Sequence, residues 1–250
     1  MKAIILAAGL GSRLGKFGEN IPKGLIIING KTLIQRQIEI FHNCGINDIT
    51  VITGHNNELI NYPDITYIKN KNYANTNMNE SFFCAREKFN DSVIVSYSDI
   101  VYDQKIIEQI LKFDHDFSVG VRLDWKSSYE NRTQHPLSEA ENVLIENSKI
   151  INIGKNISFC SKNQEIGEFL GIIKFSKKGI TELLETYLEL KKNHKGKFHN
   201  SNSLQEAYLT DMLHEIIDSG KVLHPVLLNN FWFEIDTVED LERAKNSLKT

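Results

Sequence analysis

An apolar run at the start of the chain passes directly into a glycine-containing turn, and this feature restricts the possible folds more than any other. The segment reads Leu6-Ala7-Ala8-Gly9-Leu10-Gly11-Ser12-Arg13-Leu14. Residues 2–8 predict a short buried strand, and a glycine turn after it is typical of a first parallel strand that leads into a loop and a helix. Gly9 and Gly11 have no side chains, so successive N–H groups can approach phosphate oxygens. The segment therefore predicts an α/β fold with an anion-binding loop.

The spacing of this turn does not match the two best-known phosphate loops. Leu14 stands where the third glycine of a GxGxxG dinucleotide motif would be, and no Gly-Lys-Ser/Thr sequence follows as in a P-loop. By itself the turn is explained equally well by a tight connection between a strand and a helix.

Strand and helix patterns alternate along the rest of the chain. Strands are expected at 25–28, 49–53, 64–69, 92–96, 117–122, 167–175 and 222–228, with a hairpin over 142–153 that turns at Asn147. Helices are expected at 33–41 (ended by Gly45), 81–89, 104–113, 178–192 and 203–219, with a last one from about Thr237. The order indicates a Rossmann-like, doubly wound mixed sheet in a single domain over 1–250. Residues 124–141 are polar and irregular, which is typical of a lid or substrate loop.

Composition excludes several classes of protein. The 29 basic and 32 acidic residues give a net charge of −3 without a basic face, so we expect a small polyanionic ligand rather than nucleic acid. No apolar run approaches the ~18 residues of a membrane span. The three cysteines have neither an even number nor CxxC spacing, which favours a reducing cytoplasm. The sequence leaves the oligomeric state open.

A lysine behind a proline strengthens the phosphate interpretation. Lys23, in Pro22-Lys23-Gly24-Leu25, precedes the second expected strand and can reach back across the glycine loop. Lysine supplies a mobile point charge suited to a triphosphate, and Arg13 adds a forked cation. The alternative for Lys23 is an ordinary solvated lysine.

The glycine turn with Arg13 and the Pro22-Lys23 pair together closely resemble the nucleotidyltransferases that join a nucleoside triphosphate to a phosphorylated small molecule. The resemblance extends over essentially the whole chain. It implies that the nucleotide phosphates are held by Lys23, Arg13 and the backbone of Leu6, Ala7, Ala8, Gly9 and Gly11.

Two aspartates correspond to the metal ligands of that family. Asp99 follows the central expected strand, and Asp236 precedes the last helix. Mg²⁺ is normally held by one or two carboxylates plus substrate oxygens, so the resemblance implies Mg²⁺ at these residues. The alternatives are a turn residue for Asp99 and a helix cap for Asp236, although Thr237 can fill the latter role.

The segment expected to contact the base resembles that of cytidylyltransferases. It contains Asn77, Asn79 and Ser81, whose amides and hydroxyl can pair with a pyrimidine edge. Asn79 or Ser81 can equally be a helix cap.

Later motifs resemble the nucleotidyltransferases associated with phosphonate pathways, and the chain as a whole most resembles the cytidylyltransferases for phosphocholine, 2-aminoethylphosphonate or phosphoglutamine. Lys155 falls where the family keeps a second lysine for the phosphorus group of the acceptor, and Arg132, Glu168 and Asp211 are candidates to contact the rest of it. An acidic pair suits an acceptor with an ammonium group. Glu168 can instead be a strand-edge carboxylate, and Asp211 a solvated helix residue.

These features together predict a Mg²⁺-dependent nucleotidyltransferase that couples CMP from CTP to a small phosphorylated or phosphonate amine, for capsule or other surface-glycan modification. Two alternatives stay open at this point. One is a sugar-1-phosphate nucleotidyltransferase that prefers UTP or dTTP, and the other is a non-catalytic nucleotide sensor.

Overall fold

The computed structural model describes residues 1–9, 21–130, 132–159 and 161–248. Within these ranges the strands are β1 Lys2–Ala7, β2 Ile27–Ile28, β3 Lys31–Thr32, β4 Asp48–Thr53, β5 Thr66–Lys69, β6 Val93–Tyr97, β7 Ile100–Tyr102, β8 Phe117–Arg122, β9 Asn142–Glu146, β10 Lys149–Gly154, β11 Gln164–Phe175, β12 His224–Leu227 and β13 Trp232–Glu234. The α-helices are α1 Leu33–Asn43, α2 Met78–Phe83, α3 Gln104–Leu111, α4 Lys177–Asn193, α5 Leu209–Asp218 and α6 Val238–Ser247.

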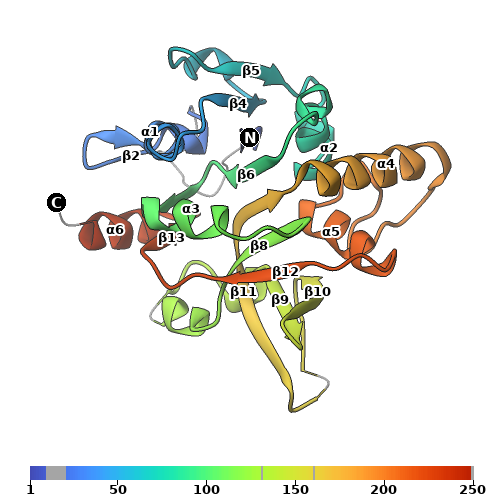
Figure 1. Cartoon of the computed structure of the whole chain (residues 1–250). Coiled ribbons are helices and arrows are strands. Elements are labelled where there is room, and N and C mark those ends of the chain that lie inside the picture. Colours follow the sequence, from blue (N-terminus) through green and yellow to red (C-terminus); the bar gives the residue numbers. More distant parts are fainter. Residues whose placement is uncertain (10–20, 131, 160, 249–250) are drawn as a thin grey trace.

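Most strands belong to one mixed sheet. Its order is β10-β9-β11-β6-β1-β4-β5, and β8 joins it through β11 and carries β12. Strand β1 pairs in parallel with β4 and β6, whereas β11 runs antiparallel to β6, β8 and β9. Helices α1, α3 and α6 lie on one side of the molecule, and α2, α4 and α5 lie on the other (Figure 1). The predicted doubly wound mixed sheet in a single domain is confirmed.

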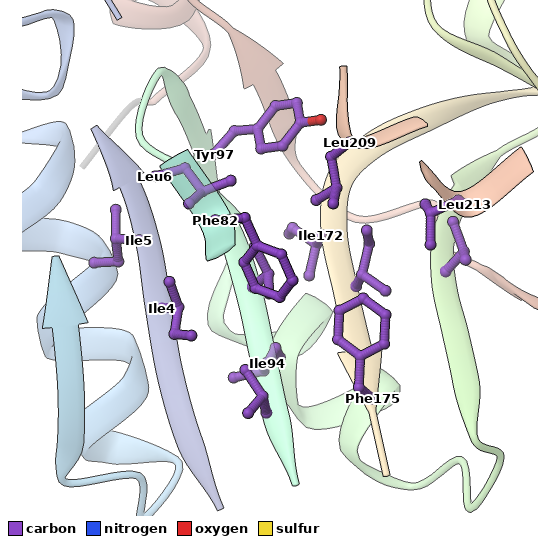
Figure 2. Packing of buried hydrophobic residues seen from close by; sticks show 14 of the residues in the cluster. Ile4, Ile5, Leu6, Phe82, Ile94, Tyr97, Ile172, Phe175, Leu209 and Leu213 are labelled. Carbon is purple, nitrogen blue, oxygen red and sulfur yellow. The ribbon is translucent and has the colours of Figure 1, made fainter. Parts of the chain in front are cut away.

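The core lies on both faces of the parallel strands. Ile4 and Leu6 of β1 point toward Phe82 of α2, whereas Ile5 points to the opposite face, as the two-residue period of a strand requires (Figure 2). Tyr97 lies at the end of this packed cluster and its hydroxyl points away from it (Figure 2). The carboxyl ends of β1 and β6 therefore mark where the apolar core stops.

Two expected helices are shorter than the sequence indicates. The helix expected over 81–89 is α2, which ends at Phe83, and a separate 3-10 turn at Arg86–Lys88 lets Phe89 pack on Phe82 with ring centroids 4.8 Å apart. The helix expected over 203–219 begins at Leu209, because the Asp211 carboxylate accepts a hydrogen bond from Tyr208 N and fixes the helix start there.

The segment 124–141 contains more structure than expected. It includes 3-10 helices at Trp125–Tyr129 and Leu137–Glu139, and Trp125, Tyr129 and Ala140 form a small buried cluster. The segment is tied to α6, since the Arg243 guanidinium donates to Ser128 O over 2.8 Å. In the described part of the chain, no helix is both long enough and apolar enough to cross a membrane.

Candidate active site

A cavity of about 450 Å³ opens at the carboxyl ends of β1 and β6, where an open α/β sheet places its ligands. Its volume falls in the range of small-molecule sites. It is lined by Leu6, Ala7, Ala8, Gly9, Lys23, Tyr73, Ala74, Thr76, Asn77, Met78, Ser81, Tyr97, Ser98, Asp99 and Tyr208. The predicted phosphate-binding residues Leu6, Ala7, Ala8 and Gly9 thus share one cavity with Lys23. Gly11 and Arg13 lie outside the described residues.

Lys23 is positioned by the tight packing of its own turn. It begins the 3-10 helix Lys23–Leu25, and a side chain at Gly24 would come within 2.4 Å of Ile34 Cδ1 on α1. Glycine therefore lets this turn lie directly against α1. The alternative of a solvated lysine is wrong, because the Lys23 side chain is only 15% exposed and points into the site.

The Lys23 ammonium joins the two predicted metal carboxylates. Its Nζ lies 3.2 Å from Asp99 Oδ2 and forms a closer contact with Asp236 Oδ1. Burial alone would lower the pKa of Lys23, but the charges of Asp99 and Asp236 raise it above its ordinary value. Lys23 is therefore a fixed positive charge at any physiological pH.

Asp99 and Asp236 are brought together by backbone pairing. Asp99 lies between β6 and β7, β7 pairs with β13, and Ile235 N donates to Asp99 O over 2.8 Å. Thr237 is the N-cap of α6 and forms a capping box with Asp240, so Asp236 is not needed as a cap. Two carboxylates within reach of one cation are a suitable donor set for Mg²⁺.

His135 and Glu234 lie beside Asp236, and Arg132 lies beside the nearby Asp240. His135 Nδ1 lies 3.3 Å from Asp236 Oδ2, and Arg132 Nε lies 2.6 Å from Asp240 Oδ1. Burial and the neighbouring carboxylates of Asp236 and Asp99 raise the pKa of Glu234 well above its ordinary value. Arg132, expected at the acceptor, thus lies in a buried ion pair that connects the 124–141 segment to α6.

The expected base-contacting residues divide into two groups. Asn77 and Ser81 line the cavity, and Asn77 is also the N-cap of α2, where its Oδ1 accepts from Met78 N over 2.9 Å. Asn79 is fully buried and does not line the cavity. A role in reading the base stays a prediction for Asn77 and Ser81, and the position of Asn79 gives it no support.

A second, smaller cavity lies next to the first and shares Tyr97 with it. It has a volume of about 30 Å³, and its lining includes Tyr97, Tyr129, Glu141, Glu168, Trp232 and Glu234. This small cavity combines aromatic rings with four carboxyl groups, since Glu139 also lines it, and this composition suits a cationic group.

Glu168 is the most buried acid of this small cavity. It is 2% exposed; Tyr129 donates to its Oε1 over 2.6 Å, while its Oε2 has no hydrogen-bond partner among the residues the structure describes. Burial raises its pKa to about 7. A bend in β11 places Glu168 in the small cavity. The strand pairs with β9 up to Glu168 and with β6 from Ile172, and Gly171, which lies between these two parts of the strand, has φ +71°.

The other two acceptor candidates are occupied by contacts within the chain. Lys155 Nζ lies 2.8 Å from Glu139 Oε2 and 5.2 Å from the ring centre of Tyr208, which lines the large cavity. Asp211 is 4% exposed, and its carboxylate accepts from Tyr208 N and Ser201 Oγ. Asp211 is therefore a helix-capping residue here, and it lines neither cavity.

Sequence reasoning missed several residues of the site. Glu234 could have been found, because alternation in Glu234-Ile235-Asp236 places the first and third side chains on one face. Glu141 ends the 124–141 segment and was not singled out, yet burial raises its pKa to about 7 and Thr210 donates to it over 2.6 Å. In the sequence, Tyr97 and Trp232 could not be distinguished from ordinary aromatic residues of the core.

Replacing Glu168 by glutamine is expected to change how stability depends on pH. The folded pKa of about 7 lies above the ordinary value of 4.5, so the stabilising contribution of this group is complete below pH 4.5 and is lost as the pH rises through 7. We therefore expect Glu168→Gln to match the parent at pH 4.5 and to exceed its unfolding free energy by up to about 3 kcal/mol at pH 8.

Chemical denaturation across this pH range measures the difference. Glu146→Gln, on the neighbouring strand β9, is the matched control for loss of a glutamate. A Glu168→Gln variant whose stability falls with pH as steeply as that of the parent would contradict the assignment.

Comparison with known proteins shows the family and the fold of this chain. Residues 3–147 match the MobA-like NTP transferase domain. A CTP:phosphoglutamine cytidylyltransferase from Campylobacter jejuni is 30% identical, over 97% of this chain and 98% of that protein. A choline-phosphate cytidylyltransferase from Streptococcus pneumoniae is 26% identical, over 100% of this chain and 99% of that protein. The solved structure of the CTP:phosphocholine cytidylyltransferase from Streptococcus pneumoniae has a TM-score of 0.74 at 24% identity and covers 99% of both chains, which confirms the fold.

Proposed function

This chain belongs to the MobA-like NTP transferase domain family and is a nucleotidyltransferase, and we propose that it transfers CMP from CTP to a small phosphorylated acceptor that carries an ammonium group. The observation that carries the reaction class is the contact of Lys23 with Asp99 and Asp236 at the edge of the large cavity. CTP is favoured because the cytidylyltransferases above match this chain over nearly its whole length.

Mg²⁺ is the proposed cofactor. Asp99 and Asp236 would hold it, and it would supply charge neutralisation for the phosphates of the nucleotide. The Lys23 ammonium is close enough to both carboxylates to remain beside the same phosphates. Asp99 and Asp236 balance the charge of Lys23 in the free protein, and the Lys23 ammonium would bind the phosphates when the two carboxylates hold a metal ion.

The transfer is an in-line displacement at the α-phosphorus. An oxygen of the acceptor phosphate forms the new P–O bond, and the bond to pyrophosphate breaks. The attacking oxygen is already anionic, so no general base is needed and positioning and charge neutralisation carry the catalysis. Lys23 is the described side chain best placed to neutralise the charge that develops.

The small cavity is the proposed site of the acceptor ammonium group. Glu168 offers a buried carboxylate oxygen that has no hydrogen-bond partner in the described part of the chain, and the rings of Tyr97, Tyr129 and Trp232 provide cation–π faces. The volume of about 30 Å³ accommodates roughly one water, so the 124–141 segment, which contributes Tyr129, has to shift when the acceptor binds. A phosphorylated amino acid is our first candidate, since the phosphoglutamine enzyme is 30% identical.

A pyrophosphate-release assay tests the proposal. CTP, UTP, dTTP, ATP and GTP are each combined with MgCl₂ and with phosphoglutamine, phosphocholine, 2-aminoethylphosphonate or a sugar 1-phosphate. We expect release with CTP and an amine acceptor. Turnover with UTP or dTTP and a sugar 1-phosphate would replace the proposal with the second enzyme class, and CTP binding without turnover on any acceptor would support a nucleotide sensor. A role in surface-glycan modification and a cytoplasmic location stay predictions.

A further inference from the structure

Two histidines and an aspartate form a cluster outside both cavities. His214 and Asp218 are one helical turn apart on α5, and His199 lies in the loop before this helix. One ligand atom from each of the three lies within 4.8 Å of the other two. Four-coordinate Zn²⁺ holds neighbouring ligand atoms about 3.3 Å apart, so rotation of the two imidazoles about their side-chain bonds would bring three ligands to such a site.

The surroundings of His199 support a ligand role. The imidazoles of His199 and His214 are stacked with ring centroids 4.7 Å apart, and His199 Nε2 lies 2.9 Å from Glu215 Oε2. A carboxylate at one ring nitrogen is the usual device that fixes the tautomer and orientation of a metal-ligating histidine. Two imidazoles and a carboxylate with an adjoining second carboxylate are a donor set for a late first-row divalent ion.

The backbone at His199 is unusual. His199 lies in a tight turn closed by hydrogen bonds between Phe198 and Ser201, and its φ is +48°. Non-glycine residues adopt this region infrequently, and such strain persists where the surroundings impose it. The turn directs His199 back toward α5, where Glu215 and His214 lie.

The cluster can be reached from solvent. The side chains of His199 and His214 are 14% and 24% exposed, which leaves an approach for an ion and for water as a further ligand.

The geometry points to a Zn²⁺ site formed by His199, His214 and Asp218, with Glu215 orienting His199. The ion would join the turn at His199 to α5. Asn200 and Asn202, in and just after this turn, line a third cavity. Asn77 and Tyr208 line both this third cavity and the large cavity proposed for the nucleotide. Occupancy would therefore hold one rim of the nucleotide site in place.

Equilibrium dialysis against Zn²⁺ in excess MgCl₂, with metal analysis, tests the site without an activity assay. Magnesium saturates oxygen-only sites, so a tight Zn²⁺ ion retained by the full-length protein reports nitrogen ligands. We expect about one such ion per chain, a higher melting temperature with Zn²⁺, and slower amide hydrogen exchange at residues 198–202.

Variants assign the ion to the cluster. His214→Asn should remove it, and Glu215→Gln should weaken binding by about tenfold or more. The matched control is His115→Asn with His224→Asn, a second stacked imidazole pair with ring centroids 3.7 Å apart that is not part of the cluster. Asp236→Asn should keep the tight ion. Zn²⁺ binding unchanged in His214→Asn and in His199→Asn, or no ion retained in excess Mg²⁺, would overturn the inference. Neither result bears on whether the protein transfers CMP, which the pyrophosphate-release assay decides separately.

Discussion

Asp236→Asn is expected to lower the rate of nucleotidyl transfer by about 10³-fold or more while leaving the fold intact. Asp236 is 4% exposed and contacts Lys23, so it lies where a metal ion and the nucleotide phosphates would meet. Asparagine keeps the shape of the side chain but removes the negative charge that attracts Mg²⁺. Lys23 retains Asp99 as a partner, which limits the loss of stability.

Steady-state pyrophosphate release and thermal unfolding measure the two parts of this prediction. Asp103→Asn is the matched control, because Asp103 also follows a strand but is exposed and makes no side-chain capping bond at the start of α3. Full activity in Asp236→Asn would refute the metal assignment. If Asp236→Asn is both inactive and unfolded, Asp99→Asn is measured in its place, because Asp99 is less buried than Asp236. The same loss of rate is expected for Asp99→Asn.

Lys23→Met is expected to affect both catalysis and stability. Removing the ammonium should reduce kcat/KM for CTP by about 10²- to 10³-fold, since Lys23 is the described cation closest to the proposed phosphate site. It also leaves Asp99, Asp236 and the neighbouring Glu234 without their shared cation. A buried charge that loses its partner costs about 3–5 kcal/mol, and partial exposure here reduces this to about 2 kcal/mol.

The stability part of this prediction has a specific signature. Mg²⁺ should restore much of the lost stability in Lys23→Met, because the ion takes the place of the ammonium between the carboxylates. Lys174→Met is the control: Lys174 is 6% exposed and donates to Phe113 O, far from these carboxylates in the fold, so Mg²⁺ should not change its stability. Equal responses of the two variants to Mg²⁺ would contradict the proposed cation site.

The parts of the site that could be predicted lie at the ends of strands. Residues 2–8 and 92–96 predicted buried strands because they are continuous apolar runs, and a residue just beyond such a strand is necessarily near the sheet edge. That reasoning placed Gly9 and Asp99 correctly beside one cavity. Lys23 depended on a motif, and the structure shows the physical cause, a glycine that lets its turn pack on α1.

The acceptor residues were harder to predict. Glu168 and Asp211 were paired as two acids, but Asp211 caps α5 and only Glu168 reaches the small cavity. A carboxylate that caps a helix and one that faces a ligand have the same sequence pattern. Which of the two roles each acid has depends on the bend of β11 and on the residue at which α5 begins. The periodicity of apolar residues along the sequence predicts neither of these features.

The sequence by itself determined the α/β class, the doubly wound order and the edge of the sheet at which the predicted phosphate loop lies, because these follow from apolar periodicity and from glycine and proline at fixed places along the chain. Only the tertiary structure decided which charged side chains meet. Lys23 and Asp236 are 213 residues apart, and they touch because β7 pairs with β13 at the edge where β1 and β6 end. Long-range contacts of this kind depend on strand pairing and side-chain direction, which no local pattern specifies.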